Sequence, residues 1–329
     1  MKKLILSLLC VSSLVLNAQE EEKGEFTLSG TVDVYGTTNF TEGSGTPGIL
    51  IASPENANAF GLGSANTVFA YEKGKAGVVA DLAFGPKADD ANLAGAINQL
   101  YAYYNVNDKL TVTAGQFNTF LGYEVINPSA NFNYTVSYLF NAGPFSHTGL
   151  KLDYAVSEDL SLMLAVTNGH AVTSADGNFT DATQFGAQVG YKGQYLNIIA
   201  GAIEAGGPRD WFFIDYTGGF DLTESFYVGI NAAYANSGEA DSGYQGVALY
   251  LQNTFSDKFA LGLRPELFSL NGASEESVTA VTLTANTNLT SNLKLITDLR
   301  FDSSDDMIIE AFPNKTSTST FTMAAVYSF

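Results

Sequence analysis

The stretch Phe321-Thr-Met-Ala-Ala-Val-Tyr-Ser-Phe329 alternates between two kinds of side chain. One set is apolar and ends in two aromatic residues, and it comprises Phe321, Met323, Ala325, Tyr327 and Phe329. The residues between them are small and mostly polar. An alternation with a period of two predicts a β-strand whose two faces meet different surroundings.

The aromatic residues at the end of this stretch make the prediction more specific. A final Phe329, with Tyr327 two positions earlier, resembles the closing strand of bacterial outer-membrane β-barrels. In those proteins the barrel-assembly machinery recognises this end of the chain, and the resemblance implies the same role for Tyr327 and Phe329 as an assembly signal. The alternative is a soluble all-β protein that ends in phenylalanine by chance.

Residues 1–18 have the features of a secretory signal peptide. Two lysines form a charged start, an apolar run extends from Leu4 to Leu16, and Ala18 lies just before a run of acidic residues. We therefore predict a signal peptide over residues 1–18 and an outer-membrane β-barrel over residues 19–329. The rest of the chain contains no run of 18 apolar residues, so the sequence predicts no transmembrane helix.

Composition narrows the function classes. The chain has 329 residues, with 15 Lys and Arg against 34 Asp and Glu. Loss of the signal would remove Lys2 and Lys3 and leave 13 basic residues, for a net charge of −21. Such a surface argues against nucleic-acid binding, because phosphates need basic partners. The single cysteine, Cys10, lies within the predicted signal, so the mature chain is expected to have no disulfide and no cysteine-based metal or catalytic site.

Short polar turns recur along the chain and separate alternating segments. Each is rich in Asp, Asn, Ser or Gly, as hairpin turns are, and they lie at residues 73–75, 107–109, 157–159, 192–194, 221–224, 256–258 and 290–292. The other connections are longer, at residues 41–66, 85–98, 169–182 and 302–317 among others. Short turns at one end and long loops at the other are typical of a membrane barrel. The seven turns, with a first and a last strand added, predict a closed antiparallel transmembrane β-barrel of about sixteen strands.

The alternation also predicts which side chains face lipid. Leu293, Leu295, Leu299 and Phe301 form an apolar set, whereas Lys294, Asp298 and Arg300 occupy the other phase. The segment after residue 258 repeats the pattern, with Phe259, Leu261, Leu263 and Leu267 outward and Arg264 and Glu266 inward. Between residues 225 and 234, Tyr227 and Asn231 are predicted to face inward.

One connection does not fit this pattern of alternating strands and short turns. Residues 118–144 separate the fifth and sixth predicted strands and carry an unusual number of aromatic and aliphatic side chains, namely Phe120, Tyr123, Phe132, Tyr134, Tyr138, Leu139 and Phe140. A long loop of this character would be poorly placed in water. We predict that it folds into the lumen as a constriction loop, since a barrel of sixteen strands has an aqueous interior. The alternative is one more hairpin over residues 132–144, which would enlarge the barrel.

The same region carries a family resemblance. The sequence Tyr134-Thr-Val-Ser-Tyr-Leu-Phe-Asn-Ala-Gly-Pro-Phe-Ser-His-Thr-Gly149, followed by Val166-Thr-Asn-Gly169, resembles the OmpL-like β-barrel porins that are common in Bacteroidetes. The resemblance covers residues 24–329 and implies an outer-membrane porin. The basic residue that is frequent in the family near residues 135–137 is absent, and His170 stands where an aromatic residue is frequent, so no ion selectivity is carried over.

Other candidate sites are weaker. A Ser-His-Asp hydrolase would use His147 with Ser146 or Ser137, but no nucleophile-elbow motif surrounds these serines, and we predict structural or lumen-lining roles for His147 and His170. Acidic residues at 89–90 and 302–306 offer oxygen ligands for Ca²⁺. They lack a spaced calcium-loop pattern and are expected to be solvated. The sequence therefore predicts no metal, no cofactor and no enzymatic activity.

Inward-facing charges are the candidates for controlling permeation. The predicted constriction and pore-lining residues are Tyr123 and Glu124 in the long loop and Lys151, Arg264, Glu266, Lys294, Asp298 and Arg300 on the strands. Opposed acidic and basic groups across a constriction would create a transverse field that biases the passage of ions. The alternative is local pairing, of Arg264 with Glu266 and of Arg300 with Asp298.

These features predict an outer-membrane porin in which small hydrophilic solutes or ions diffuse passively through a water-filled lumen narrowed by an inward loop. The expected partners are outer-membrane lipids, the barrel-assembly machinery and the solutes, with homo-oligomers as a further expectation. One alternative is a non-conducting structural or surface-binding barrel whose lumen the loop blocks. A second alternative is a barrel enzyme.

Overall fold

The computed structural model describes residues 23–41, 58–92, 95–169, 182–204, 207, 209–236, 243–272, 277–304 and 316–329. The predicted signal peptide, His170 and the acidic residues 305–306 lie outside these ranges, as does the side chain of Asp90. No helix in the described ranges is long and apolar enough to cross a membrane.

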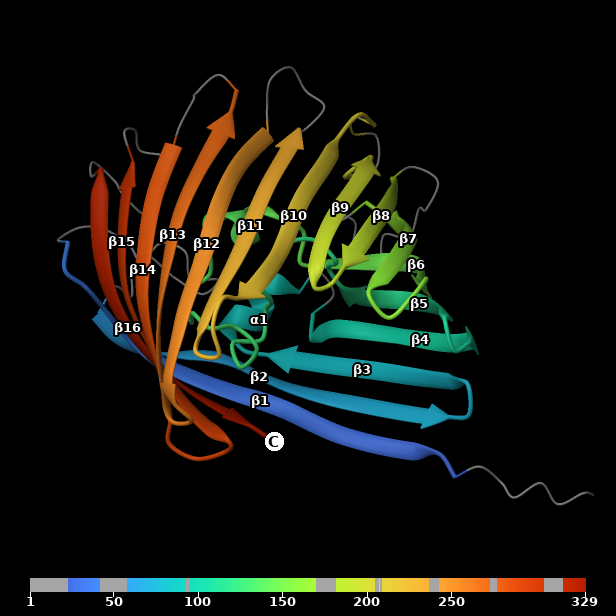
Figure 1. Cartoon of the computed structure of the whole chain (residues 1–329), viewed down its shortest axis with the longest axis horizontal. Coiled ribbons are helices and arrows are strands. Elements are labelled where there is room, and N and C mark those ends of the chain that lie inside the picture. Colours follow the sequence, from blue (N-terminus) through green and yellow to red (C-terminus); the bar gives the residue numbers. More distant parts are fainter. Residues whose placement is uncertain are drawn as a thin grey trace, which may run out of the picture.

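Sixteen antiparallel strands within these ranges form one closed barrel, which confirms the predicted fold and strand number. They are β1 Glu25–Asn39, β2 Asn58–Lys73, β3 Ala76–Phe84, β4 Ile97–Asn107, β5 Leu110–Asn118, β6 Ser146–Ala155, β7 Leu160–Asn168, β8 Thr183–Tyr191, β9 Gln194–Gly201, β10 Phe212–Asp221, β11 Phe226–Asn236, β12 Gly243–Ser256, β13 Phe259–Asn271, β14 Ser277–Asn288, β15 Leu293–Ser304 and β16 Ser317–Ser328. Each strand pairs with its neighbours in sequence, and β16 pairs with β1 to close the ring (Figure 1). Closure leaves no unpaired edge, as a barrel in lipid requires.

The predicted turns join the strands at one end of the barrel. All seven lie between consecutive strands, and the turn between β8 and β9 shows why its sequence suits a hairpin. Lys192 and Gly193 both have positive φ angles, of 51° and 78°. Tight hairpin turns that match the twist of the strands require such angles. Two of the long loops are shorter than predicted: β2 begins at Asn58, eight residues before the predicted limit at residue 66, and β15 continues to Ser304, inside the predicted loop 302–317.

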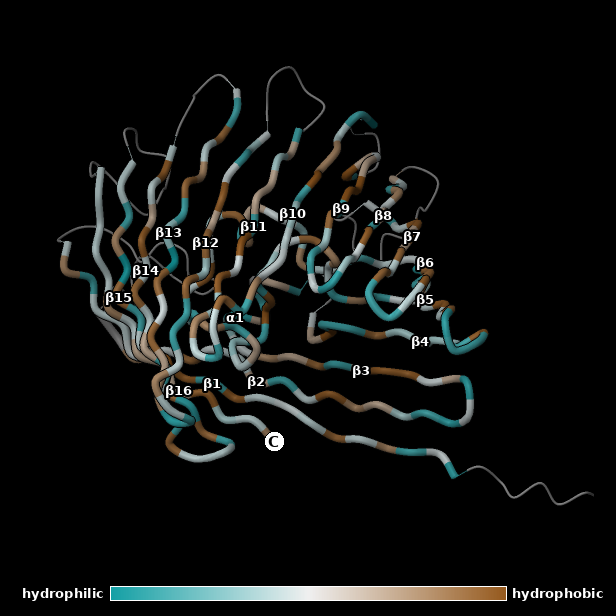
Figure 2. Tube along the Cα trace, viewed as in Figure 1, coloured by the Kyte–Doolittle hydropathy of each residue, from teal (hydrophilic) through white to brown (hydrophobic). Residues whose placement is uncertain are grey.

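The two faces of the strands differ as predicted. On β15, Ile296, Asp298 and Arg300 are buried while Phe301 is exposed, and on β13 Arg264 and Glu266 are buried while Leu263 and Leu267 are exposed. Figure 2 shows the resulting alternation of hydrophilic and hydrophobic positions along the strands. The outer face is therefore apolar and the inner face carries the charged side chains, the arrangement expected of a barrel in lipid.

Two connections lie inside the ring of strands (Figure 1). The first contains the short helix α1 Pro86–Ala91 between β3 and β4, and the second is residues 119–145 between β5 and β6, which we call the inner loop. The inner loop contains the five-residue helix α2 Tyr138–Ala142. The alternative of an additional hairpin over residues 132–144 is wrong. Ser137 caps α2, since its side chain accepts a hydrogen bond from the N–H of Phe140, a role that serine favours.

Candidate functional site

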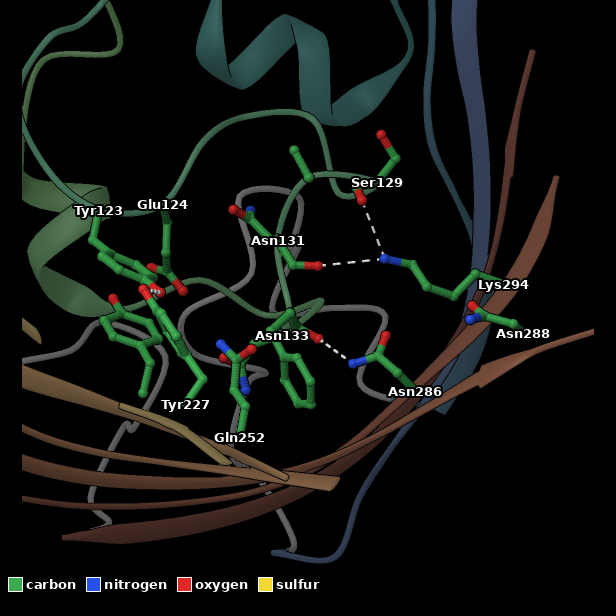
Figure 3. A pocket seen from close by; sticks show the side chains of 13 residues that line it. Tyr123, Glu124, Ser129, Asn131, Asn133, Tyr227, Gln252, Asn286, Asn288 and Lys294 are labelled. Atoms are coloured by element: carbon green, nitrogen blue, oxygen red, sulfur yellow. Dashed lines mark hydrogen bonds between the residues drawn. The ribbon is translucent and has the colours of Figure 1, made fainter. Parts of the chain in front are cut away.

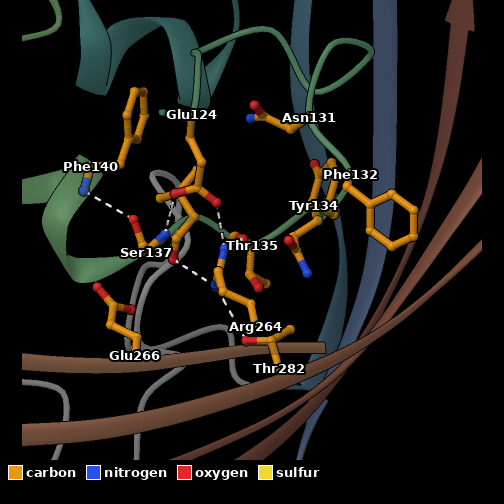
Figure 4. Close-up of polar contacts among 12 residues, drawn as sticks. Glu124, Asn131, Phe132, Tyr134, Thr135, Ser137, Phe140, Arg264, Glu266 and Thr282 are labelled. Atoms are coloured by element: carbon orange, nitrogen blue, oxygen red, sulfur yellow. Dashed lines mark hydrogen bonds and ion pairs between the residues drawn. The ribbon is translucent and has the colours of Figure 1, made fainter. Parts of the chain in front are cut away.

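The inner loop is attached to the barrel wall by a buried ion pair. Glu124 in the loop and Arg264 on β13 approach to 2.5 Å, and their side chains are 3% and 1% exposed (Figure 4). The other carboxylate oxygen of Glu124 accepts from the N–H of Ser137 at 2.7 Å. Arg264 also donates to the carbonyl oxygens of Thr135 and Val136, at 2.6 and 3.2 Å. One guanidinium therefore binds two separate parts of the loop, a task that suits its several donors.

Asp298 on β15 is the main acceptor for the loop backbone. Its Oδ2 accepts from the N–H groups of Tyr134 (3.1 Å) and Thr135 (2.8 Å) and from the Thr135 hydroxyl (2.8 Å). Its Oδ1 accepts from the hydroxyl of Thr284 on β14 at 2.7 Å. Buried amide groups are costly when they lack a partner. The carboxylate supplies that partner for a stretch of loop that pairs with no strand.

A second arginine binds the loop close to α2. Arg300 donates from Nε to Asp302 at 2.8 Å and from an NH group to the carbonyl oxygen of Val136 at 2.6 Å. Asp302 in turn accepts from the Tyr138 hydroxyl at 3.0 Å, and the guanidinium lies 4.9 Å from the centre of the Tyr138 ring. This contact places a cation over an aromatic face. Glu266 on β13 fixes the first turn of the same helix, because it accepts from the N–H of Leu139 at 2.9 Å.

Further contacts reach other parts of the wall. The N–H of Gly122 donates to Asp215 on β10 at 3.0 Å, and the Tyr134 hydroxyl donates to Asp33 on β1 at 2.6 Å. Burial and the negative charge of Asp33 raise the pKa of Tyr134 well above its usual value, so its hydroxyl keeps the proton that it donates. The side-chain amide of Asn127 donates to Thr31, also on β1, at 3.0 Å.

Helix α1 brings a cation to the same loop. Lys87 is 1% exposed, and its Nζ lies 4.6 Å from the centre of the Tyr134 ring. It contacts no hydrogen-bond acceptor within the described part of the chain. Burial lowers the pKa of Lys87, an effect that the nearby carboxylates of Asp33, Glu124 and Asp298 oppose. No periodic pattern in the sequence around Lys87 predicts that this lysine faces the interior.

Two cavities lie beside the inner loop on the side of the short turns. The first has a volume of about 590 Å³ and is lined by loop residues and by Tyr250, Gln252, Asn286, Asn288 and Lys294 of β12, β14 and β15 (Figure 3). The second, of about 420 Å³, is lined by Gln188, Tyr195, Thr217, Gly218 and Gly219 together with the start of the loop. Tyr123, Glu124 and Tyr227 line both cavities. The hydroxyls of Tyr123 and Tyr227 form a 2.9 Å hydrogen bond, so this pair separates the two spaces.

The predicted site residues fall into two groups. The larger group lies in the inner loop or contacts it, namely Tyr123, Glu124, Arg264, Glu266, Lys294, Asp298 and Arg300. Lys294 donates to the carbonyl oxygens of Ser129 and Asn131, at 3.2 and 3.5 Å. Lys151 is separate: it pairs with Asp153 on its own strand at 2.9 Å and lies 5.5 Å from the ring centre of Phe117.

The alternative of local pairing is wrong for Arg264, whereas Arg300 does pair locally but with a different acid from the one expected. Arg264 pairs with Glu124 rather than with Glu266, and Arg300 pairs with Asp302 rather than with Asp298. Asp302 is also not a solvated loop acid, since its side chain is fully buried. The reason is that the loop backbone brings its own donors, and these occupy Glu266 and Asp298.

His147 has a structural position. Its Nε2 lies 3.0 Å from the hydroxyl of Thr119, and its ring stacks on Phe120 at 4.8 Å between centres. The ring therefore supports the start of the inner loop, and its hydroxyl neighbour is Thr119 rather than Ser146 or Ser137.

Several residues of the site were missed. Asp33, Asp81 and Asp215 each face inward as a single acid between apolar neighbours, and each binds loop or wall donors. The sequence contains a signal that could have identified two of them. Val32-Asp33-Val34 and Ile214-Asp215-Tyr216 both place a charge on the inward phase of a strand. Asp302 follows Asp298 and Arg300 at the same spacing of two. The local sequence does not indicate which group of the loop each of these acids binds.

Comparisons with known proteins agree with this architecture. Among solved structures, the chain is similar to the outer membrane channel DcaP of Acinetobacter baumannii, with a TM-score of 0.63 at 13% identity over 93% of this chain and 97% of that one. It is also similar to an anion-selective porin from Comamonas acidovorans, with a TM-score of 0.68 at 13% identity over 93% and 100% of the two chains. The trimer form of OmpT from Vibrio cholerae gives 0.55 at 9% identity over 93% and 99%. At these identities the likeness shows the fold.

No curated protein matches the chain by sequence. The family described as "Putative beta-barrel porin-2, OmpL-like" matches residues 25–329, from the first residue of β1 to the last residue of the chain. The chain therefore belongs to this OmpL-like family of β-barrel porins.

Proposed function

We propose that the protein is an outer-membrane porin through which small hydrophilic solutes diffuse passively, and that the inner loop sets the narrowest part of its lumen. The observation that carries the proposal is the position of the loop. It lies inside a closed barrel with a polar inner face, and polar cavities of about 590 and 420 Å³ remain beside it. A water-filled lumen with a fixed loop is sufficient for diffusion, and no covalent step is part of the proposal.

The attachment of the loop defines how the pore would work. The Glu124–Arg264 pair, Asp298 and the Arg300–Asp302 pair hold the loop backbone at several points. A loop fixed in this way keeps a constant cross-section while solutes pass beside it. Charges at a narrow place act strongly on ions because the walls have a low dielectric constant, so we assign the control of ion passage to Glu124 and Arg264.

One observation favours a second candidate, a non-conducting barrel. The loop contacts β1, β6, β8 and the six strands from β10 to β15, which is more than half of the wall. Contacts around so much of the circumference would also suit a plug. In that case the longer connections between the strands, rather than the lumen, would carry a binding function.

Single-channel recording separates the two candidates. The mature chain, folded in detergent, would be added to a planar bilayer with a KCl gradient. Discrete steps of conductance are expected for the porin, and the reversal potential would report the selectivity. Resistance of the unheated protein to SDS would show that its barrel is folded. If such folded protein gives no conductance, the porin is rejected and the plug is favoured.

The proposal includes the route to the membrane. The chain belongs to a family of β-barrel porins, and its neighbours DcaP and OmpT are outer-membrane proteins. We infer export by a signal peptide over residues 1–18 and recognition of Tyr327 and Phe329 by the barrel-assembly machinery. Outer-membrane lipids would then cover the apolar outer face. A homo-oligomer is part of the proposal, and OmpT, a neighbour with the same fold, has a trimer form.

A further inference from the structure

We propose that the cavity lined by Lys294, Asn286, Gln252 and the Tyr123–Tyr250 pair is a binding subsite for a small solute that carries both a carboxylate and hydroxyl groups, such as a sugar acid. The inference rests on the porin function proposed above, because it names the class of solute that the lumen would select.

The first observation is a cation without an acidic partner. Lys294 lines the cavity, and its Nζ donates to two backbone carbonyl oxygens, of Ser129 and Asn131. Within the described ranges no carboxylate lies within 4.0 Å of this ammonium group. The acid that lines the cavity, Glu124, is already bound to Arg264 and to the N–H of Ser137. An ammonium has three donors, so one remains for an anionic group.

The second observation is a buried acceptor without a donor. Asn286 is 8% exposed and lines the same cavity. Its amide nitrogen donates to the carbonyl oxygen of Phe132 at 2.8 Å, while its Oδ1 has no partner in the described structure. A buried oxygen of this kind is costly when it stays unpaired. A rotation of the Asn286 side chain toward the cavity would let a solute hydroxyl supply the missing donor, and the amide of Gln252 lines the same space.

The third observation is an aromatic wall. Tyr123 and Tyr250 stack with their ring centres 4.0 Å apart and an angle of 19° between the planes. Figure 3 shows Lys294 on one side of the cavity and Tyr123 and Tyr227 on the opposite side, with Asn131, Asn133 and Asn286 between them. A solute bound across this space would place its carboxylate at Lys294 and a C–H face toward the tyrosines. The volume of about 590 Å³ is in the range of sites for small molecules.

The three groups together define the class. A simple carboxylate would use only the cation, and a neutral sugar would use only the amides and the aromatic wall. Since the cavity combines all three kinds of group, a hydroxylated carboxylate satisfies more of them than either simpler solute.

Calorimetry on the full chain folded in detergent tests this without relying on conductance. The probes are glucuronate, glucose and butyrate, and the variants are Lys294→Met, Lys294→Arg and Asn286→Ala. We expect glucuronate to bind more tightly than glucose or butyrate. Loss of a charged hydrogen bond in Lys294→Met should weaken glucuronate binding by about tenfold to a hundredfold, and Lys294→Arg should retain most of it. Lys192→Met, which removes an exposed lysine in the turn between β8 and β9, is the matched control.

The outcomes distinguish the subsite from the porin function. Equal affinity for glucuronate and glucose, or an unchanged affinity in Lys294→Met, would overturn the subsite even if the barrel conducts. Glucuronate binding that depends on Lys294 in a barrel that gives no conductance would support the subsite and reject passive diffusion. Glucuronate that also reduces the single-channel current of the wild type, but not that of Lys294→Met, would support both.

Discussion

The carboxylate of Glu124 and the guanidinium of Arg264 lie 2.5 Å apart although 140 residues separate them in the chain. Both side chains are buried, and each also binds the backbone of the inner loop. The pair therefore fixes the position of the loop against β13.

Removal of the acidic partner should change ion selectivity. In Glu124→Gln the charge of Arg264 is no longer balanced, so the reversal potential in a KCl gradient should shift toward greater anion permeability. Loss of one partner of a buried ion pair should also lower the free energy of unfolding by about 3–5 kcal/mol. Glu158→Gln removes the same charge from an exposed turn and is the control. An unchanged reversal potential would remove Glu124 from the selectivity-determining residues.

Loss of the Asp298 carboxylate should loosen the middle of the inner loop. Asp298→Ala leaves the N–H groups of Tyr134 and Thr135 without an acceptor, at a cost of about 1–3 kcal/mol for each buried group. We expect hydrogen exchange at these two amides to accelerate about tenfold or more, as measured by mass spectrometry on the folded protein. Thr297→Ala, one residue earlier on the outward phase of β15, should leave the exchange unchanged. Protection that persists in Asp298→Ala would show that other contacts hold this segment.

The pair of tyrosines between the two cavities should limit conductance. Tyr227→Ala removes the ring that lines both spaces and joins them, so the single-channel conductance should increase. Tyr227→Phe removes only the hydroxyl that bonds to Tyr123 and should have a smaller effect. Tyr234→Ala removes an outward tyrosine from the same strand as a control. Equal conductance in wild type and Tyr227→Ala would place the path of solutes elsewhere in the lumen.

Closure of the barrel should depend on a glycine. Gly30 and Phe329 exchange two backbone hydrogen bonds of 3.0 Å. A Cβ at position 30 would clash with the carbonyl oxygen of Asn66 and lie 2.6 Å from the ring of Phe329. Gly30→Val should therefore destabilise the folded barrel by about 1–3 kcal/mol and lower the temperature at which its SDS-resistant form is lost. Thr27→Val on the same strand changes an exposed position and should not. Equal melting of Gly30→Val and wild type would contradict this account of closure.

The wall of the barrel could be predicted because its signals are local. Each hairpin turn is marked by a few residues, as at Lys192 and Gly193, and each strand repeats one apolar and one polar face. Every strand has lipid on its outer face and water or the inner loop on its inner face. Apolar and polar residues therefore alternate along every strand. The inward position of Arg264, Glu266, Lys294, Asp298 and Arg300 followed from the same rule.

The partners of Arg264, Glu266 and Asp298 could not be predicted, because they lie in a loop that is distant in sequence, whereas Arg300 pairs with Asp302 two residues away. Glu266 is the acid nearest to Arg264 on its own face, yet the N–H of Leu139 binds it instead. Lys87 lies beside the loop on a short helix that no periodic pattern in the sequence indicates. Lys151 faces a different part of the lumen, where it pairs with Asp153. The position of a loop in the lumen depends on contacts from many strands at once, which no local pattern records.

The order of the chain gives the inner loop a further consequence. Its residues precede β10 to β15 in sequence, yet Asp215, Arg264, Asp298 and Arg300 on those strands supply most of its anchors. A nascent barrel that lacks its second half therefore offers the loop only its contacts with β1, β6 and β8. We therefore expect docking of the loop to be completed late in biogenesis, because only the finished wall presents all of its anchors together.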